Sequence, residues 1–399
     1  MNRTAGAPRR TASIPESAVY ASATTADGRD GVSMTENLDT TRYFDGETFT
    51  VGIVFPMSGP FGLIGPSSEL SAQLAQEELN AGDGVLGRHV ELLPIDGGRA
   101  PGEVAADVRA LIEIGAVDAV AGMHTSAVRR ALIPITSGRI PYVYTSLYEG
   151  GDRYPGLFVT GETPSGQLIP ALEFMVHELG RTKWAVVGND YVWPRKSAAI
   201  VTRYLGSIGA SVAFSAFSPI GTSDYSGAVS ALEKSECDGV VVLLLGDDAA
   251  AFHQHFAAVG LDHQCVRLSP LMDENMLLAA GSENTRDLYV SSGYFETLAT
   301  KESLDFSGRF SARFGPDAPI VGSLGQSCYE GVTFLGHLVN EAGTTEVAVL
   351  DSVSQNFSYD GARGHLTMVG GHIVQPIYLA RAGDYDFDVL GEIAPRRSV

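Results

Sequence analysis

From residue 48 onward, short apolar runs alternate with amphipathic segments, and this alternation constrains the fold more than any other feature of the sequence. Apolar runs of about four to eight residues are typical of buried strands, whereas apolar residues spaced three and four apart are typical of helices. A strand–helix series predicts a parallel sheet covered by helices. The first series has predicted strands at 48–56, 89–96, 117–122 and 141–146, and predicted helices at 67–82, 101–115 and 126–138.

The series then starts again, so the chain is predicted to form two units rather than one. Two such series predict an α/β fold with two doubly wound, Rossmann-like lobes, and a chain of 399 residues is long enough for both. Further on, the sequence VGGH (369–372) lies between two alternating runs and predicts a β-hairpin. The second series has predicted strands at 156–161, 183–190, 211–220, 238–246 and 265–271, and predicted helices at 165–179, 194–208, 224–236 and 248–259.

The charge balance excludes one class of partner. With 27 Lys and Arg against 47 Asp and Glu, the net charge is −20. Such a surface repels phosphate backbones, so direct binding to nucleic acid is not expected. No apolar stretch reaches the roughly 18 residues of a membrane span, so membrane insertion is not expected either.

Two features bear on the cellular compartment. Residues 1–47 are rich in Ala, Ser, Thr and Arg and contain no apolar core of about 7–15 residues, so a disordered tail and a cytoplasmic protein are expected. Cys237, Cys265 and Cys328 form no CxxC pair and are expected to be free thiols, which fits a reducing compartment.

Five segments resemble the branched-chain amino acid, amide and urea group of type I periplasmic binding proteins, and the resemblance covers residues 48–385. The most specific is LNAGDGVLGRHVELLPID (79–96). Within the group, the motifs Tyr-x-x-x-Tyr-Glu-Gly and Asp-Tyr-x-x-Pro-Arg are most similar to those of the amide and urea branch, in particular the cytoplasmic amide sensors that control amidase expression. The other segments are GMHTSAVRRALIPI (122–135), YTSLYEGG (144–151), GNDYVWPRKS (188–197) and GHLTMVGGH (364–372).

The resemblance implies two hinged lobes that close over a ligand, with three chain crossings at the hinge. Lobe I is then expected to comprise 48–163 and 297–345, and lobe II 164–296 and 346–399. Ligands of parallel sheets bind outside the carboxyl ends of the strands, so these ends are expected to line the cleft.

Residues that follow predicted strands are the candidates for ligand contact. The resemblance assigns such contacts to five of them, and it implies that the hydroxyls of Tyr144 and Ser146 bond a ligand amide. Leu147 stands where the amide sensors have Pro, and Trp193 where they have Tyr, so these two are expected to reshape the pocket. Asp247, after the strand 238–246, is added as a possible acceptor for a ligand N–H group. The predicted set is Ser126, Tyr144, Ser146, Leu147, Tyr191, Trp193 and Asp247.

Several charged residues keep two interpretations. Asp247, Asp248 and Asp273 each follow a predicted strand, and either line the cleft or cap the next helix. Glu149 and Arg195 are either a salt bridge across the closed cleft or solvated loop charges.

Catalytic interpretations find little support. No GxSxG, HExxH or GxxxxGK[ST] motif is present. His253 and His255 are two apart on a predicted helix and so point in different directions, which argues against a metal site with His263 and Cys265. His124 near Ser126 is interpreted as a core or cleft histidine. An enzyme, a cofactor and a metal are not expected.

Two functions are therefore considered. The first is a sensor for a small neutral amide, which the resemblance implies would regulate amidase expression through an RNA-binding antiterminator protein and could form a homodimer. The second is the substrate-binding component of an ABC transporter for urea, short amides or branched-chain amino acids.

Overall fold

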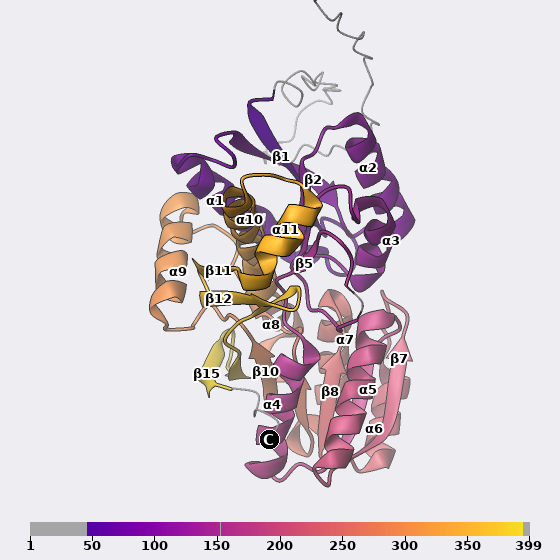
Figure 1. Ribbon diagram of the computed structural model, residues 1–399. Helices are drawn as coiled ribbons and strands as arrows, with labels where there is room; N and C mark the ends of the chain where they lie inside the picture. Colours follow the sequence, from indigo (N-terminus) through magenta and orange to yellow (C-terminus); the bar gives the residue numbers. More distant parts are fainter. Residues whose placement is uncertain (1–45, 152, 394–399) are drawn as a thin grey trace, which may run out of the picture.

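The structure is a computed structural model that describes residues 46–151 and 153–393, so nearly all of the expected N-terminal tail lies outside it. Two lobes, each a twisted sheet flanked by helices, lie one above the other in Figure 1. This confirms the predicted α/β fold with two doubly wound lobes. None of the helices in the described ranges is long and apolar enough to cross a membrane.

The first lobe has an eight-stranded sheet in the order β11-β12-β13-β5-β4-β3-β1-β2. The five strands from β5 to β2 are parallel, in the 2-1-3-4-5 order of a doubly wound sheet. Its strands are β1 (Thr48–Phe55), β2 (His89–Asp96), β3 (Ala119–Gly122), β4 (Tyr142–Tyr144), β5 (Leu157–Val159), β11 (Ser358–Gly361), β12 (Gly364–Val369) and β13 (His372–Val374); its helices are α1 (Gly65–Ala81), α2 (Pro101–Ile114), α3 (Ser126–Thr136), α9 (Lys301–Phe314), α10 (Ser323–Ala342) and α11 (Val347–Val353).

The second lobe has a seven-stranded sheet in the order β15-β14-β10-β9-β8-β6-β7. Strands β6 to β10 are parallel, β14 pairs antiparallel with β10, and β15 pairs antiparallel with β14. Its strands are β6 (Lys183–Asn189), β7 (Ser211–Ser218), β8 (Gly239–Leu243), β9 (Val266–Ser269), β10 (Leu288–Ser292), β14 (Tyr378–Ala382) and β15 (Phe387–Glu392); its helices are α4 (Pro164–His177), α5 (Val192–Ser207), α6 (Ser226–Ser235), α7 (Gly246–Ala258) and α8 (Glu274–Ala280).

Helix α10 forms the centre of the first lobe, because almost all of its side chains are buried. It packs against α1 and the sheet, and two glycines allow the close approach. A β-carbon at Gly331 would lie 2.3 Å from Cγ2 of Thr145, and one at Gly336 would lie 2.7 Å from Cδ2 of Leu79. Larger residues at these two positions would push α10 away from the sheet.

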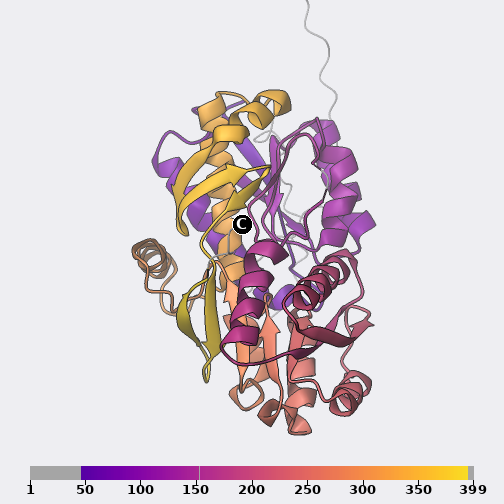
Figure 2. The ribbon, with the colours of Figure 1, turned by 60° about the horizontal axis from the view of Figure 1, so that its bottom comes forward.

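The chain passes between the lobes three times, at 160–163, 293–300 and 375–377, as predicted. The predicted boundary is wrong for residues 346–374, since α11 packs on α10, β11–β13 belong to the first sheet, and only β14 and β15 join the second (Figure 2). Gly370 and Gly371 both have positive φ and make the predicted hairpin turn. Local pattern predicts this hairpin, but the sheet it joins is decided by the long-range pairing of β13 with β5.

Candidate ligand-binding cleft

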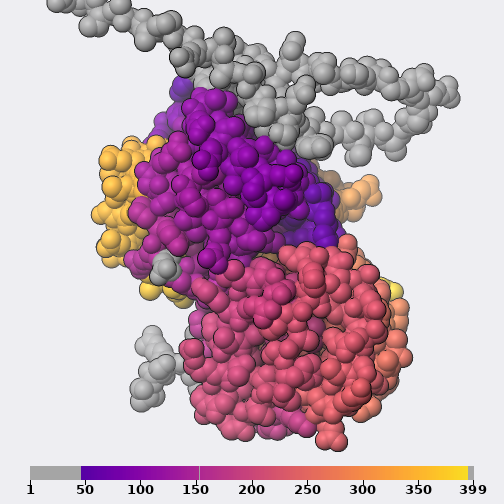
Figure 3. Space-filling model, turned by 90° about the vertical axis from the view of Figure 1, so that its right-hand side faces the viewer, coloured from indigo at the N-terminus to yellow at the C-terminus, as the bar shows by residue number. Residues whose placement is uncertain are grey.

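A small cavity of about 20 Å³ lies between the lobes, outside the carboxyl ends of strands from both sheets. Ligand pockets usually span about 300–1,000 Å³, so the lobes are closed over a space of about one water molecule and must separate to admit a ligand. The lobes touch beside it, where the backbone N–H of Asp247 donates to the Pro60 carbonyl over 2.9 Å, and Figure 3 shows them in contact. The cleft is closed. Its lining residues are Phe61, His124, Thr125, Ser126, Tyr144, Ser146, Leu147 and Leu324 from the first lobe, and Tyr191, Trp193, Leu245 and Leu271 from the second.

The structure brings six of the seven predicted site residues together in this cavity, and Asp247 is the exception. Its side chain is exposed, and only its backbone faces the opposite lobe. Gly246 explains this orientation, since a β-carbon there would lie 1.9 Å from the Pro60 carbonyl oxygen. The backbone approaches the first lobe so closely that the Asp247 carboxylate is directed to solvent. The prediction that Asp247 binds ligand is therefore wrong for this closed arrangement.

Asp248 and Asp273 have structural contacts instead. The Asp248 carboxylate accepts from Nδ2 of Asn189 over 2.6 Å and from the Gly221 backbone, and burial raises its pKa. Asp273 caps α8 by accepting from the Met276 N–H over 3.2 Å. Neither lines the cavity, so helix capping was the correct interpretation of Asp273.

Two polar atoms in the cavity wall have no hydrogen-bond partner among the described residues. Oγ of Ser126 belongs to the first residue of α3 in the first lobe, and Nε1 of Trp193 belongs to α5 in the second. Both side chains are buried, at 1% and 2% exposure. A buried polar atom without a partner costs about 1–3 kcal/mol, so each of these atoms is suited to bond a ligand. The indole can only donate, and it therefore requires an acceptor.

The hydroxyls of Tyr144 and Ser146 are already used inside the first lobe. Tyr144 donates to the carbonyl oxygens of His124 and Leu147, over 3.1 and 3.3 Å. Oγ of Ser146 accepts from the His124 N–H over 2.8 Å. The Tyr144 proton is therefore not free for a ligand amide, whereas Ser146 keeps a hydroxyl proton that no described bond uses. They fix the loop after β4 and present ring and methylene surface to the cavity.

His124 is both a cleft residue and a neutral one. Its Nε2 lies 3.0 Å from the Tyr142 hydroxyl, and burial lowers its pKa to about 3. The Ser126 hydroxyl has no bond to this imidazole, so the pair is not a nucleophile and base. The described residues of the cavity wall include no Asp, Glu, Lys or Arg. His124 is neutral at physiological pH because burial lowers its pKa to about 3.

Six of the twelve residues that line the cavity were not in the set predicted from the sequence. Leu245 and Leu271 follow β8 and β9, so their positions just after predicted strands could have identified them as cleft residues. Phe61 lies in the glycine-rich loop after β1, which was also a signal. Leu324 comes from α10, whose position against the cleft depends on tertiary packing alone.

Of the two interpretations of Glu149 and Arg195, the salt bridge between them is not formed, and the interpretation as solvated loop charges fits Arg195 but not the buried Glu149. Glu149 pairs with Arg129 of the same lobe, both side chains almost fully buried, and Nη1 of Arg129 donates over 3.0 Å. Arg195 instead pairs with Asp190 at the surface over 2.6 Å. The Arg129 guanidinium lies 4.7 Å from the centres of the Tyr144 and Tyr148 rings, so the ion pair supports one wall of the cleft.

The remaining candidates for chemistry are structural. In the described ranges, no group of three metal-ligating side chains comes together. Nδ1 of His253 lies 2.9 Å from a buried Arg267 nitrogen, so this ring nitrogen has a partner within the protein. Cys237, Cys265 and Cys328 are free thiols, as predicted.

The comparison with known proteins decides the family. A sequence model described as periplasmic binding protein matches residues 48–386. This chain belongs to the periplasmic binding protein family. The two-lobe fold and three crossings agree with the type I branch that the motifs indicated.

Solved structures share the fold at low identity. A solute-binding protein of an ABC transporter from Rhodopseudomonas palustris, in complex with p-hydroxybenzoic acid, is 18% identical with a TM-score of 0.79, covering 88% of this chain and 98% of that one. The branched-chain amino acid transporter substrate-binding protein LivJ of Streptococcus pneumoniae, in complex with isoleucine, is 19% identical with a TM-score of 0.75, covering 86% and 99%. The leucine-binding protein LivK of Thermotoga maritima is 18% identical with a TM-score of 0.78, covering 87% and 99%. These neighbours are binding proteins.

A pair of buried carboxyl groups behind the cleft predicts a dependence of stability on pH. Oδ2 of Asp273 and Oε2 of Glu274 have no partner among the described residues, and both face Gly322 at the start of α10. Burial raises the pKa of Asp273 to about 7, and burial together with Asp273 raises that of Glu274 to about 8. Unfolded carboxyls ionise near about pH 4, so the folded state binds more protons between about pH 4 and 8.

The free energy of unfolding is therefore expected to fall as pH rises through that range, by at least about 1 kcal/mol between pH 5.5 and 8. Urea unfolding at the two pH values measures it. The variant carrying Asp273→Asn and Glu274→Gln should lose most of this dependence. Equal pH dependence in the variant and the natural protein would contradict the assignment.

Proposed function

We propose that this chain is the solute-binding component of an ABC-type importer, and that its two lobes close over a small uncharged compound with a carbonyl group. The observation that carries the proposal is the pair of unpartnered polar atoms, Oγ of Ser126 and Nε1 of Trp193, which come from opposite lobes. A ligand that bonds both stabilises the closed arrangement over any open one. Neighbours of this fold that bind solutes for transporters support the importer assignment.

The neutral cavity wall supports an uncharged ligand. Burying the ammonium group of an amino acid requires a matching carboxylate, and the carboxylate of Asp247 is exposed. A carbonyl oxygen suits the start of α3, where Ser126 lies beside backbone N–H groups that the helix leaves free. Short aliphatic amides, including those derived from nitriles, and urea meet these requirements. The side chains of Leu147, Leu245 and Leu271 favour an amide with an apolar tail over urea.

A panel of ligands tests the class. We expect butyramide at 100 times its Kd to stabilise the folded protein by about 2.7 kcal/mol in thermal unfolding. Acetamide and urea are expected to bind more weakly, because they leave the leucine side chains without contacts. Leucine and 4-hydroxybenzoate at equal concentration are the charged controls. Stabilisation by leucine, with none by any amide, would refute the uncharged class.

A second function is supported by the same neutral wall, namely an amide sensor in the cytoplasm. In that case, closure of the lobes over the ligand changes the affinity for a regulator protein of the RNA-binding antiterminator type. This change in affinity then alters the expression of an amidase or nitrile-degrading operon. The sensor would need no nucleic-acid surface of its own, in agreement with the net charge of −20.

Cell fractionation separates the two functions. The importer assignment expects the protein outside the cytoplasmic membrane and a ligand-dependent complex with permease subunits. The sensor assignment expects it in the cytoplasm with a soluble protein partner. A cytoplasmic location without permease association would overturn the importer proposal and leave the amide class untouched.

A further inference from the structure

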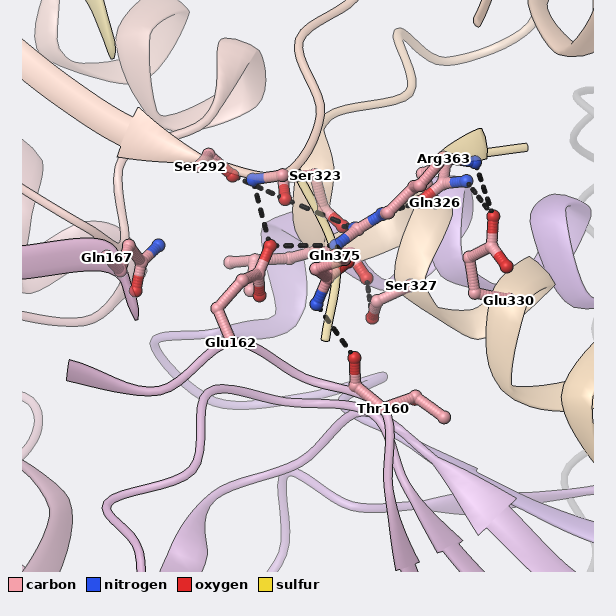
Figure 4. Close-up of polar contacts among 12 residues, drawn as sticks. Thr160, Glu162, Gln167, Ser292, Ser323, Gln326, Ser327, Glu330, Arg363 and Gln375 are labelled. Carbon is pink, nitrogen blue, oxygen red and sulfur yellow. Dashed lines mark hydrogen bonds and ion pairs between the residues drawn. The ribbon is translucent and has the colours of Figure 1, made fainter. Parts of the chain in front are cut away.

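One buried guanidinium lies where the three chain crossings meet. Arg363 is in the turn between β11 and β12, and its ion pair with Glu162 is almost completely shielded, at 2% and 3% side-chain exposure. Figure 4 shows Arg363 between the crossing that contains Glu162 and the end of α10 that contains Ser323. This side chain belongs neither to the cavity wall nor to any contact with the proposed ligand.

The hydrogen bonds of Arg363 reach two crossings directly. Nη1 donates to Oε1 of Glu162 over 2.7 Å and to Oε1 of Gln375 over 2.9 Å. Its other donors bind α10, where Nε contacts Gln326 over 2.6 Å and Nη2 contacts the Ser323 carbonyl over 2.8 Å. The guanidinium thus anchors the first and third crossings to the buried helix of the first lobe.

Its partners link the crossings to each other. Oε1 of Glu162 also accepts from the backbone N–H of Gly293 over 3.0 Å, which brings in the second crossing. Nε2 of Gln375 donates to the Thr160 carbonyl over 3.0 Å, which joins the third crossing to the first. All three crossings are therefore connected through one ionic cluster in this closed arrangement.

Gly293 shows how tightly the cluster is packed. A β-carbon there would lie 2.8 Å from both Nη1 of Arg363 and Oε1 of Glu162. Even one methyl group would displace the ion pair, so the second crossing depends on a glycine at this point.

We propose that Arg363 is a positioning residue that holds the three crossings in the closed arrangement and so sets the balance between open and closed lobes. Opening a hinge changes backbone dihedrals in a few crossing residues. When the crossings move relative to each other, the bonds from Glu162 to Gly293 and from Gln375 to Thr160 lengthen. Charged bonds in a buried site are costly to lose, so the cluster favours closure. The inference concerns the ligand-free protein and does not depend on the proposed ligand.

Distances between spin labels on the two lobes of the ligand-free protein test whether Arg363 favours the closed arrangement. Arg109→Cys on α2 and Arg203→Cys on α5 are exposed positions on different lobes, and Cys237→Ser removes the one cysteine that is not buried. We expect Arg363→Met to raise the ratio of open to closed molecules at least about tenfold. Gly293→Ala and Gln375→Leu should shift the ratio in the same direction by a smaller factor. These two variants replace Arg363→Met in the distance measurement if that variant does not fold.

The matched control is Arg267→Met, which also removes a buried guanidinium. Arg267 donates to the carbonyls of Asn284 and Arg286 inside the second lobe, away from the crossings. A merely structural role for Arg363 predicts lower stability for both variants and an unchanged distance distribution. Unchanged distances in the folded Arg363, Gly293 and Gln375 variants would overturn the proposal.

Discussion

Replacing Glu149 with alanine is expected to lower the free energy of unfolding by about 3–5 kcal/mol. The substitution leaves the Arg129 guanidinium buried without a counterion, since its side chain is 4% exposed and Glu149 is its partner. The contacts of Arg129 with the rings of Tyr144 and Tyr148 do not replace the lost carboxylate. Urea unfolding at constant pH measures the loss.

Two variants serve as controls for this prediction. Asp190→Ala breaks the exposed pair with Arg195, whose side chain is 54% exposed, and should lower stability far less, because water screens this pair. The double variant Arg129→Met with Glu149→Leu removes both charges and should recover much of the stability lost in Glu149→Ala. If Glu149→Ala costs no more than Asp190→Ala, the pair is not buried as described.

Trp193→Phe and Ser126→Ala are each expected to weaken ligand binding about 10- to 100-fold, with no loss of stability in the ligand-free protein. Each substitution removes one polar atom that has no partner among the described residues, and preserves the remaining shape of the wall as far as possible. A hydrogen bond that a buried group makes only to the ligand is worth about 1–3 kcal/mol when removed. Calorimetric titration with butyramide, together with thermal unfolding of the free protein, measures both quantities.

Tyr144→Phe is the matched control for these donors. Its hydroxyl bonds the His124 and Leu147 carbonyls within the lobe, so its removal should cost about 1 kcal/mol of stability and change affinity less. The opposite pattern, with Tyr144→Phe abolishing binding and the other two variants unaffected, would show that the ligand bonds Tyr144 and that Ser126 and Trp193 are wall residues only.

Part of the site was predictable because it depends on local order along the chain. Residues that follow a strand in a parallel sheet gather at one edge, so Ser126, Tyr144, Tyr191 and Trp193 could be placed in the cleft from strand ends and motifs. Which hydroxyls are free could not be predicted. Tyr144 and Ser146 have the residue types of ligand donors, but their polar atoms are bonded to the His124 backbone across a loop.

The pairing of charges was the least predictable feature. Arg195 was the cation considered for Glu149 from the sequence, but its partner is Arg129, because α3 brings Arg129 beneath the loop after β4. Asp247 follows a strand as the other candidates do, yet the close approach of Gly246 to Pro60 directs its side chain outward. Such outcomes depend on contacts between segments that are distant in sequence, and no local pattern encodes them.

Local sequence pattern accounts for the two strand–helix series, for the hairpin turn at Gly370 and Gly371, and for the strand ends that form the cleft, because hydrophobic periodicity and glycine conformation act over a few residues. Long-range packing is needed to bring β11–β13 into the first sheet and to place Arg363 against Glu162, 201 positions away in the chain. Strand pairing and buried ion pairs are selected by the packing of the whole molecule, since each needs a partner at one distance and in one orientation that the folded chain alone provides.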